Sequence, residues 1–126
     1  MIFGIGTDIV AIKRIEDGLF KHGDRFLHRI LSEAEVAEYA NTIAPARFLA
    51  KRFAVKEAFS KAFGTGIGGA VGWHDVRVVH DQHGKPSVTV SEALQARMLA
   101  AGVGHSHVSI SDEQDHAIAF VVLEKE

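Results

Sequence analysis

Apolar residues are concentrated at the start of the chain, where they form a short continuous run. Residues 2–12 are rich in Ile, Val and Phe and include Gly4 and Gly6. This pattern predicts a buried strand whose backbone packs closely against another element. Asp8 is an acidic residue inside this strand.

Helical periodicity follows the strand. Gly23 separates two short predicted helices, 14–20 and 24–31. The segment 32–35 has the spacing of a capping box and opens a third helix, which should end before Pro45. The longest helical pattern covers 46–63, and Gly64 is its expected stop.

The second half of the chain alternates in the manner of strands. Residues 73–80 and 87–90, joined by a turn at 81–86, predict a hairpin. Ser91 caps a helix to about Ala101, and 107–111 and 117–124 form a last strand pair around the polar turn 112–115. The order predicts a single α+β domain over 1–126, with helices packed on a mainly antiparallel β-sheet.

Composition narrows the class of protein. The chain has 126 residues with 47% hydrophobic content, which suits one core. Fourteen basic and 16 acidic residues give a net charge of −2, which argues against binding to nucleic acid or to an anionic membrane. The chain has no cysteine, no signal-peptide pattern and no apolar run near the ~20 residues of a membrane span, so we expect a soluble, unprocessed, cytoplasmic protein.

Positive charge is concentrated on the longest predicted helix, where residues 47–61 hold five basic side chains and one acidic one. Such crowding is unfavourable unless an anion offsets it. Arg52 and Lys56 fall at the edge of the apolar arc of this helix, which makes them candidates for phosphate contacts. Extension of both long side chains into water is an equally good interpretation.

Two carboxylates could hold a metal ion. Glu57 lies four residues before Lys61, the spacing of an ordinary helical ion pair. It could instead share a divalent ion with Asp8, whose place in an apolar strand indicates burial, unless Asp8 is simply a paired buried acid. Magnesium suits the first arrangement, because it needs only one or two carboxylates besides phosphate oxygens and water.

Three further motifs argue against other kinds of binding site and enzyme. The glycines of 64–69 follow a helix rather than a strand, so they match neither a dinucleotide-binding fingerprint nor a P-loop, although they could let backbone N–H groups approach a phosphate. His105 and His107 lack the further ligands of a zinc site. No Gly-x-Ser-x-Gly elbow of a serine hydrolase is present.

Several blocks together closely resemble the bacterial holo-acyl-carrier-protein synthase family of 4′-phosphopantetheinyl transferases. They are FGIGTDIV at 3–10, FLHRIL at 26–31, FLAKRFAVKEAFSKAFGTGIG at 48–68, GKP at 84–86 and HVSIS at 107–111. The resemblance implies transfer of the 4′-phosphopantetheine arm of coenzyme A to a serine of apo acyl carrier protein, with release of 3′,5′-ADP, in fatty acid biosynthesis.

The resemblance also implies roles for individual residues. Asp8 and Glu57 match the two magnesium ligands of the family. Glu57 also matches the base that accepts the serine proton, directly or through a metal-bound water. Lys61 matches the residue that assists the leaving phosphate. The expected coenzyme-binding residues are Arg52, Lys56, Lys61, Gly64, Lys85, Pro86 and His105.

The early basic segment resembles the family's surface for the acidic carrier protein, with Phe26 as an apolar anchor. Its expected members are Arg14, Lys21, Arg25, Phe26 and Arg29. From spacing alone, a solvated amphipathic helix is the preferred interpretation. Family members are typically homotrimers with active sites between subunits, and the same is expected here.

One position departs from the family pattern, since Asp112 stands where many relatives carry a histidine. Two other functions remain open from the residues. A magnesium-dependent phosphohydrolase could use the same carboxylates, and a nucleotide-binding module without turnover could use the same basic helix.

Overall fold

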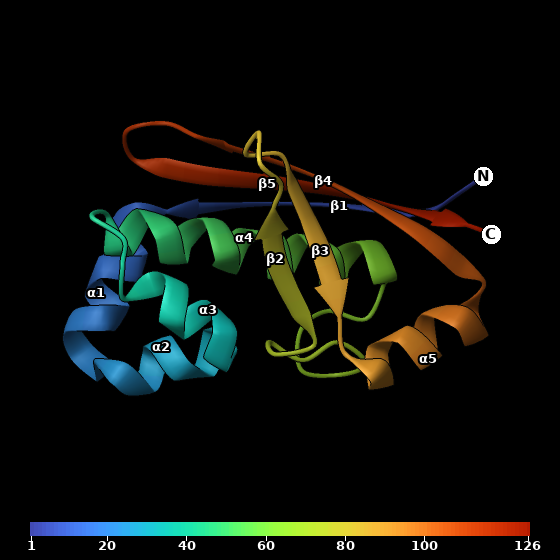
Figure 1. Ribbon diagram of the computed structural model, residues 1–126, viewed down its shortest axis with the longest axis horizontal. Helices are drawn as coiled ribbons and strands as arrows, with labels where there is room; N and C mark the ends of the chain where they lie inside the picture. The colour runs from blue at the N-terminus through green and yellow to red at the C-terminus, as the bar shows by residue number, and fades with distance from the viewer.

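The computed structural model describes all residues from 1 to 126 and shows an α+β fold, as predicted. Five helices pack against antiparallel strands (Figure 1). The elements in chain order are β1 (Ile2–Ala11), α1 (Ile12–His22), α2 (Asp24–Ile30), α3 (Glu33–Tyr39), α4 (Pro45–Phe63), β2 (Val76–His80), β3 (Pro86–Val90), α5 (Glu92–Ala101), β4 (Val103–Asp112) and β5 (His116–Lys125).

The strands form two separate sheets. One sheet has three antiparallel strands in the order β1-β5-β4, and the hairpin β2-β3 is a second, two-stranded sheet. In Figure 1 the long helix α4 runs along one face of the larger sheet, with α1 to α3 at one end of the molecule and α5 at the other. Because α4 lies between the sheet and the other helices, apolar side chains around most of its circumference are buried.

Two glycines allow β1 and α4 to come into direct contact. A Cβ atom at Gly4 would lie 2.0 Å from the carbonyl oxygen of Ala62, and one at Gly6 would lie 2.0 Å from that of Ala58. No real Cβ contact is that short, so only glycine fits at either position. The predicted close approach of this strand is therefore confirmed, and it brings β1 against the charged part of α4.

The larger sheet is apolar on both faces. Its inner face packs on α4 through fully buried residues of β5 such as Ala119 and Val121. On the outer face, Ile5 and Ile9 of β1 are 59% and 61% exposed, and Phe120 of β5 is 43% exposed. The register places Ile9 opposite Ile118, so these side chains form one row across the strands. The single chain leaves this row uncovered.

Local chemistry explains where the other elements begin and end. The predicted capping box is confirmed, because Ser32 and Glu35 exchange the hydrogen bonds that cap α3. The predicted strand from Trp73 was too long: it begins at Val76, because Asp75 accepts a hydrogen bond from the backbone N–H of Gly72 and closes a turn. No helix is both long and apolar enough to cross a membrane.

Candidate active site

Asp8 presents its carboxylate where β1 crosses α4. Its side chain is 15% exposed, and its Oδ1 atom lies 3.0 Å from Lys61 Nζ. The same ammonium donates to the carbonyl oxygen of Thr7 at 3.0 Å. Lys61 therefore pairs with Asp8, and not with Glu57 as its helical spacing suggested.

The second oxygen of Asp8 is buried and has no hydrogen-bond partner. Burying an unsatisfied carboxylate oxygen is costly, so its retention indicates a ligand that is not part of the protein chain. This orphaned atom is the clearest sign of a binding site at this place.

Glu57 is the second acid of the site, one helical turn before Lys61. Its pKa is raised, first because burial disfavours the charged form and then because the negative charge of Asp8 lies close to it. The charges of Lys61 and Arg14 oppose this increase. A carboxylate whose pKa is raised is better suited to accept a proton than an ordinary glutamate.

The residues present fit a magnesium ion. Asp8 and Glu57 supply two carboxylates, and the orphaned oxygen of Asp8 is free to coordinate. No group of three or more His, Cys, Asp or Glu side chains gathers anywhere in the chain, so a metal cage made only of protein ligands is absent. Magnesium is the divalent ion that is commonly held by one or two carboxylates together with substrate phosphates.

Arg52 and Lys56 are not where the sequence interpretation placed them. They are 4% and 0% exposed, and both point into the interior. Lys56 Nζ donates to Glu35 at 2.6 Å and to the carbonyl oxygens of Ile30 and Trp73 at 2.6 and 2.8 Å, which uses all three ammonium protons. The anion that offsets these cations is therefore an internal side chain and not a bound phosphate.

Glu35 is a buried charged residue that the sequence did not mark as a partner of the basic helix. It is fully buried, and it accepts hydrogen bonds from Arg52, Lys56 and the backbone N–H of Val78. Its place in the Ser32 capping box could be recognised from the sequence. Its ion pair with Lys56 could not, because the two residues are 21 positions apart and meet only through packing.

The remaining expected coenzyme residues lie in different places of one chain. Gly64 caps α4 with a φ of 97°, two turns beyond Glu57. Pro86 lines a cavity of about 140 Å³ that also contains His80 and Asp112, at the β4 edge of the sheet. His105 of β4 lies on the outer face of the larger sheet, and Lys85 lies in the β2-β3 turn. One chain does not bring Lys85, Pro86 and His105 to Asp8, which is on the opposite edge strand β1.

The expected carrier residues, in contrast, lie together on one side of α1 and α2. A cavity of about 610 Å³ and an adjoining one of about 200 Å³ share His22 and Phe26. The ring of Phe26 packs where Gly18 leaves room, since a Cβ there would be 2.6 Å from it. All five expected residues line one or both cavities: Arg14, Lys21, Arg25, Phe26 and Arg29.

Arg14 joins this surface to the acidic site. Its guanidinium lies 5.3 Å from the centre of the Phe53 ring, which lines the larger cavity, and its charge partly opposes the increase in the pKa of Glu57. A group held in the cavity would thus be near the carboxylate that can accept a proton. The arrangement can hold a divalent ion, neutralise a phosphate through Lys61 and remove a proton through Glu57.

The chain belongs to the 4′-phosphopantetheinyl transferase superfamily, whose family model matches residues 4–121. A holo-[acyl-carrier-protein] synthase of Laribacter hongkongensis is 51% identical over 98% of this chain and 99% of its own length.

Solved structures agree with this assignment. The holo-[acyl-carrier-protein] synthase of Neisseria meningitidis superposes with a TM-score of 0.96 at 47% identity, covering 99% of this chain and 100% of that one. The enzyme of Bacillus anthracis, crystallised in complex with CoA (3′,5′-ADP), superposes with a TM-score of 0.85 at 41% identity, covering 100% of this chain and 99% of that one.

Proposed function

We propose that this protein transfers the 4′-phosphopantetheine group of coenzyme A to a serine of apo acyl carrier protein in the cytoplasm, as a step that supports fatty acid biosynthesis. The observation that carries the proposal is the meeting of Asp8, with its orphaned buried oxygen, and Glu57 beside Lys61. Coenzyme A is the co-substrate because relatives of the same family bind it.

In the proposed reaction the serine hydroxyl oxygen attacks the β-phosphorus of coenzyme A. A new P–O bond forms to serine, the bond to the bridging oxygen of the pyrophosphate breaks, and 3′,5′-ADP leaves. Glu57 accepts the hydroxyl proton, which its raised pKa favours. The Lys61 ammonium offsets charge on the phosphates.

Asp8 and Glu57 would hold the magnesium ion. When bound, the ion would neutralise the pyrophosphate oxygens and stabilise the charge that develops on them. The two acids also fix the place of the phosphates relative to Arg14 and the carrier surface, because both belong to elements locked together by Gly4 and Gly6.

The coenzyme site is proposed to include residues from two copies of the chain. Lys61 and Gly64 would contact it from one copy, and Lys85, Pro86 and His105 from a neighbour, in a homotrimer. Two facts support this division. The second group lies away from Asp8 within one chain, and the outer sheet face carries an uncovered apolar row that a neighbour could bury. Arg52 and Lys56 are not part of this surface, since both are buried.

Mass spectrometry of the carrier tests the function directly. The purified chain is mixed with apo acyl carrier protein, coenzyme A and magnesium, and the carrier is weighed before and after. A gain of one phosphopantetheine per carrier is expected. Cleavage of coenzyme A without carrier gain would indicate a phosphohydrolase, and coenzyme binding with no product would indicate a binding module.

A further inference from the structure

The interior of the molecule contains an ion pair that the proposed reaction does not use. Glu35 of α3 and Lys56 of α4 are both 0% exposed, and Glu35 Oε1 lies 2.6 Å from Lys56 Nζ. Burial alone would raise the pKa of Glu35, but the charge and hydrogen bond of Lys56, together with backbone hydrogen bonds from Ser32 and Val78, lower that pKa. Replacing such a pair by apolar residues is often neutral for stability, so its presence calls for another role.

The Lys56 ammonium ties two other segments to α4. It donates to the carbonyl oxygen of Ile30, the last residue of α2, at 2.6 Å. It also donates to the carbonyl oxygen of Trp73, in the loop before β2, at 2.8 Å. The last carbonyls of a helix have no partner within it, so Lys56 satisfies a group at α2 that would otherwise be unpaired in the interior.

Glu35 keeps this ammonium in place from the other side. Besides Lys56 it accepts from Arg52 Nη1 at 3.3 Å, from the N–H of Val78 at 3.2 Å and from the N–H of Ser32 at 3.1 Å. These contacts fix the start of α3 and strand β2 relative to α4. Lys56 therefore has a rigid anchor from which to hold the end of α2 and the loop.

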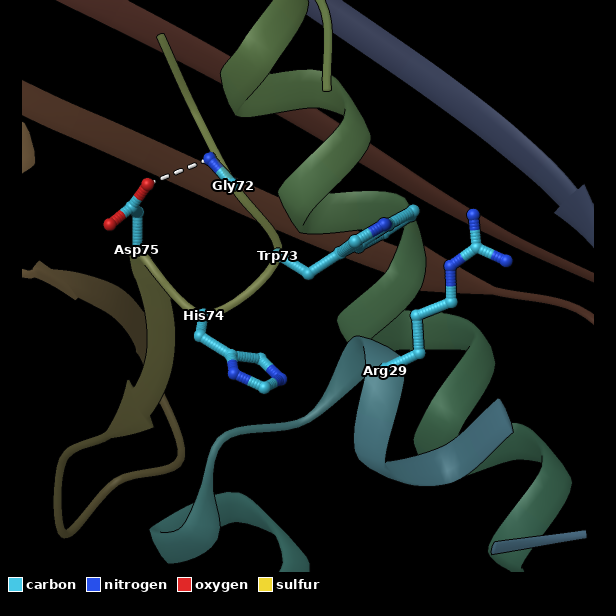
Figure 2. A pocket seen from close by; sticks show the side chains of 5 residues that line it. All are labelled: Arg29, Gly72, Trp73, His74 and Asp75. Atoms are coloured by element: carbon cyan, nitrogen blue, oxygen red, sulfur yellow. Dashed lines mark hydrogen bonds between the residues drawn. The ribbon is translucent and has the colours of Figure 1, made fainter. Parts of the chain in front are cut away.

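A cavity of about 310 Å³ lies between the two segments that Lys56 holds (Figure 2). Arg29, the neighbour of Ile30, forms one wall, and the segment Gly72–Asp75 forms the other. His74 Nε2 makes a second link by donating to the carbonyl oxygen of His28 at 2.7 Å. Figure 2 shows the Trp73 ring against α4 with the Arg29 side chain extending beside it, and that ring is 5.1 Å from the ring of Phe53.

This cavity continues the proposed carrier surface. Arg29 lines both it and the 200 Å³ cavity that contains Arg25 and Phe26. The Phe53 ring, which contacts Trp73, also lines the 610 Å³ cavity with Arg14. The loop that Lys56 holds is therefore the continuation of the surface built by α1 and α2.

We propose that the Glu35–Lys56 pair is a positioning device that sets the segment Gly72–Asp75 against the end of α2, and so completes the surface that receives the carrier protein. The proposal rests on the proposed function. It predicts that Lys56 affects binding of the carrier protein. A direct contact with coenzyme A would instead affect binding of the coenzyme. Lys56 and Glu57 are adjacent on α4, so their side chains point about 100° apart and can serve different sites.

The variant Lys56→Met removes the three hydrogen bonds and keeps an unbranched side chain that lacks only the terminal atom of lysine. Glu35 keeps Arg52 and two backbone donors, so it is not left unpaired. We expect the KM for apo acyl carrier protein to rise about tenfold, the effect of losing one to two hydrogen bonds that fix a docking surface. The KM for coenzyme A and the kcat should change less than twofold.

Arg77→Met is the matched control. Arg77 belongs to the same network through Glu38, at 3.7 Å, but touches neither Ile30 nor Trp73. Both KM values should stay at the wild-type level in this variant. If Lys56→Met does not fold, the double variant E35Q/K56M, which removes both charges and leaves Arg52 paired with Glu38 at 2.9 Å, is measured in its place.

Trp73 is the only tryptophan of the chain, so its fluorescence reports the position of the loop without any substrate. In Lys56→Met we expect its emission to move to longer wavelength and its quenching by acrylamide to increase, with no change in Arg77→Met. Unchanged Trp73 fluorescence, equal changes in both KM values, or a rise only in the KM for coenzyme A would each overturn the proposal. If the wild-type chain transfers nothing, the proposed function fails. The fluorescence of Trp73 in Lys56→Met still shows whether Lys56 holds the loop.

Discussion

Gly6 and Asp8 lie two residues apart on the same face of β1. The face that allows α4 to approach the strand closely at Gly6 therefore also carries the Asp8 carboxylate. A backbone without a side chain at Gly6 lets α4 lie directly on the strand. Asp8 on this face pairs with Lys61 of α4, and its negative charge lies close to Glu57. The site therefore depends on a missing Cβ as much as on the carboxylates.

Gly6→Ala tests this dependence. The new Cβ would lie 2.0 Å from the carbonyl oxygen of Ala58, so α4 must move away from β1. We expect the free energy of unfolding to fall by about 3 kcal/mol and transfer activity to fall with it, measured by urea denaturation and by carrier modification. Gly69→Ala is the control, because its nearest neighbour would be 3.9 Å away. Equal stability of the two variants would contradict the close-packing explanation.

Asp8→Asn and Glu57→Gln test the carboxylates without changing their size. Each removes a negative charge that the proposed magnesium site needs, so we expect transfer to fall by at least about a hundredfold. The unfolding free energy should change by less than about 1 kcal/mol, because neither acid belongs to the apolar core and the Lys61 side chain that pairs with Asp8 is half exposed. Carrier mass measurements and thermal unfolding, run in parallel, check both parts. Full activity in either variant would remove that residue from the mechanism.

At the scale of elements, the β4-β5 hairpin is fastened to the start of α4. Arg47 donates to Asp112 Oδ2 at 2.8 Å and to the carbonyl oxygens of Glu113 and Gln114 at 2.7 and 3.0 Å. Lys51 adds a second ion pair to Asp112 at 3.4 Å. The aspartate that departs from the family's histidine thus has a structural role in this chain.

This contact predicts a pH dependence of stability. The hydrogen bond from Arg47 lowers the pKa of Asp112 below its ordinary value of 3.8, and Lys51 adds to the effect. A lowered pKa means that the contribution is complete above 3.8 and is lost as the pH falls through the lower folded-state value. We expect Asp112→Asn to be less stable at pH 7 by about 0.5–1 kcal/mol.

Urea denaturation of wild type and Asp112→Asn at several pH values measures this difference. The two curves should converge as the pH falls below 3.8. A difference that persists unchanged at pH 2 would mean that the aspartate charge is not its source.

At the scale of the whole molecule, two surfaces remain without partners in a single chain. One is the basic surface of α1 and α2 with its adjoining cavities. The other is the apolar row on the outer face of the larger sheet. The first fits an acidic carrier protein, and the second fits further copies of this chain.

Reversing charge on the basic surface should weaken carrier binding selectively. We expect Arg14→Glu with Arg25→Glu to raise the KM for the carrier at least tenfold at low salt, with a smaller effect at high salt because ions screen exposed charges. Arg77→Glu with Lys125→Glu changes the net charge equally outside this surface and serves as the control. Steady-state kinetics at two ionic strengths provide the comparison. Identical behaviour of the two double variants would leave only net charge as the cause.

A charge placed in the apolar row should prevent assembly. Light scattering should give the mass of a trimer for the wild type and of a monomer for Phe120→Asp, since an unpaired carboxylate cannot be buried between copies. Ile43→Asp, which changes an apolar residue in a loop that is more exposed than Phe120, should remain trimeric. A monomeric wild type would remove the proposed shared coenzyme site.

The sequence by itself determined the elements and the main candidates for chemistry. Gly64 and Gly102 end their helices in left-handed conformations, and Ser32 and Ser91 begin theirs through side-chain caps. These signals involve residues within a few positions of each other, so they can be recognised without the fold. Gly4 and Gly6 within an apolar strand also predict a close backbone approach, although its partners, Ala58 and Ala62, are distant in the chain.

Only the tertiary structure decided which charges face the site. Arg52 and Lys56 lie on the same helix as Lys61, yet their side chains are buried because Glu35 and the carbonyl oxygens of Ile30 and Trp73 accept hydrogen bonds from them. Their hydrogen-bond partners are at least 14 residues away in the chain. Whether a long cation reaches water or an internal acceptor depends on the packing of several elements at once, and local sequence spacing does not contain that information.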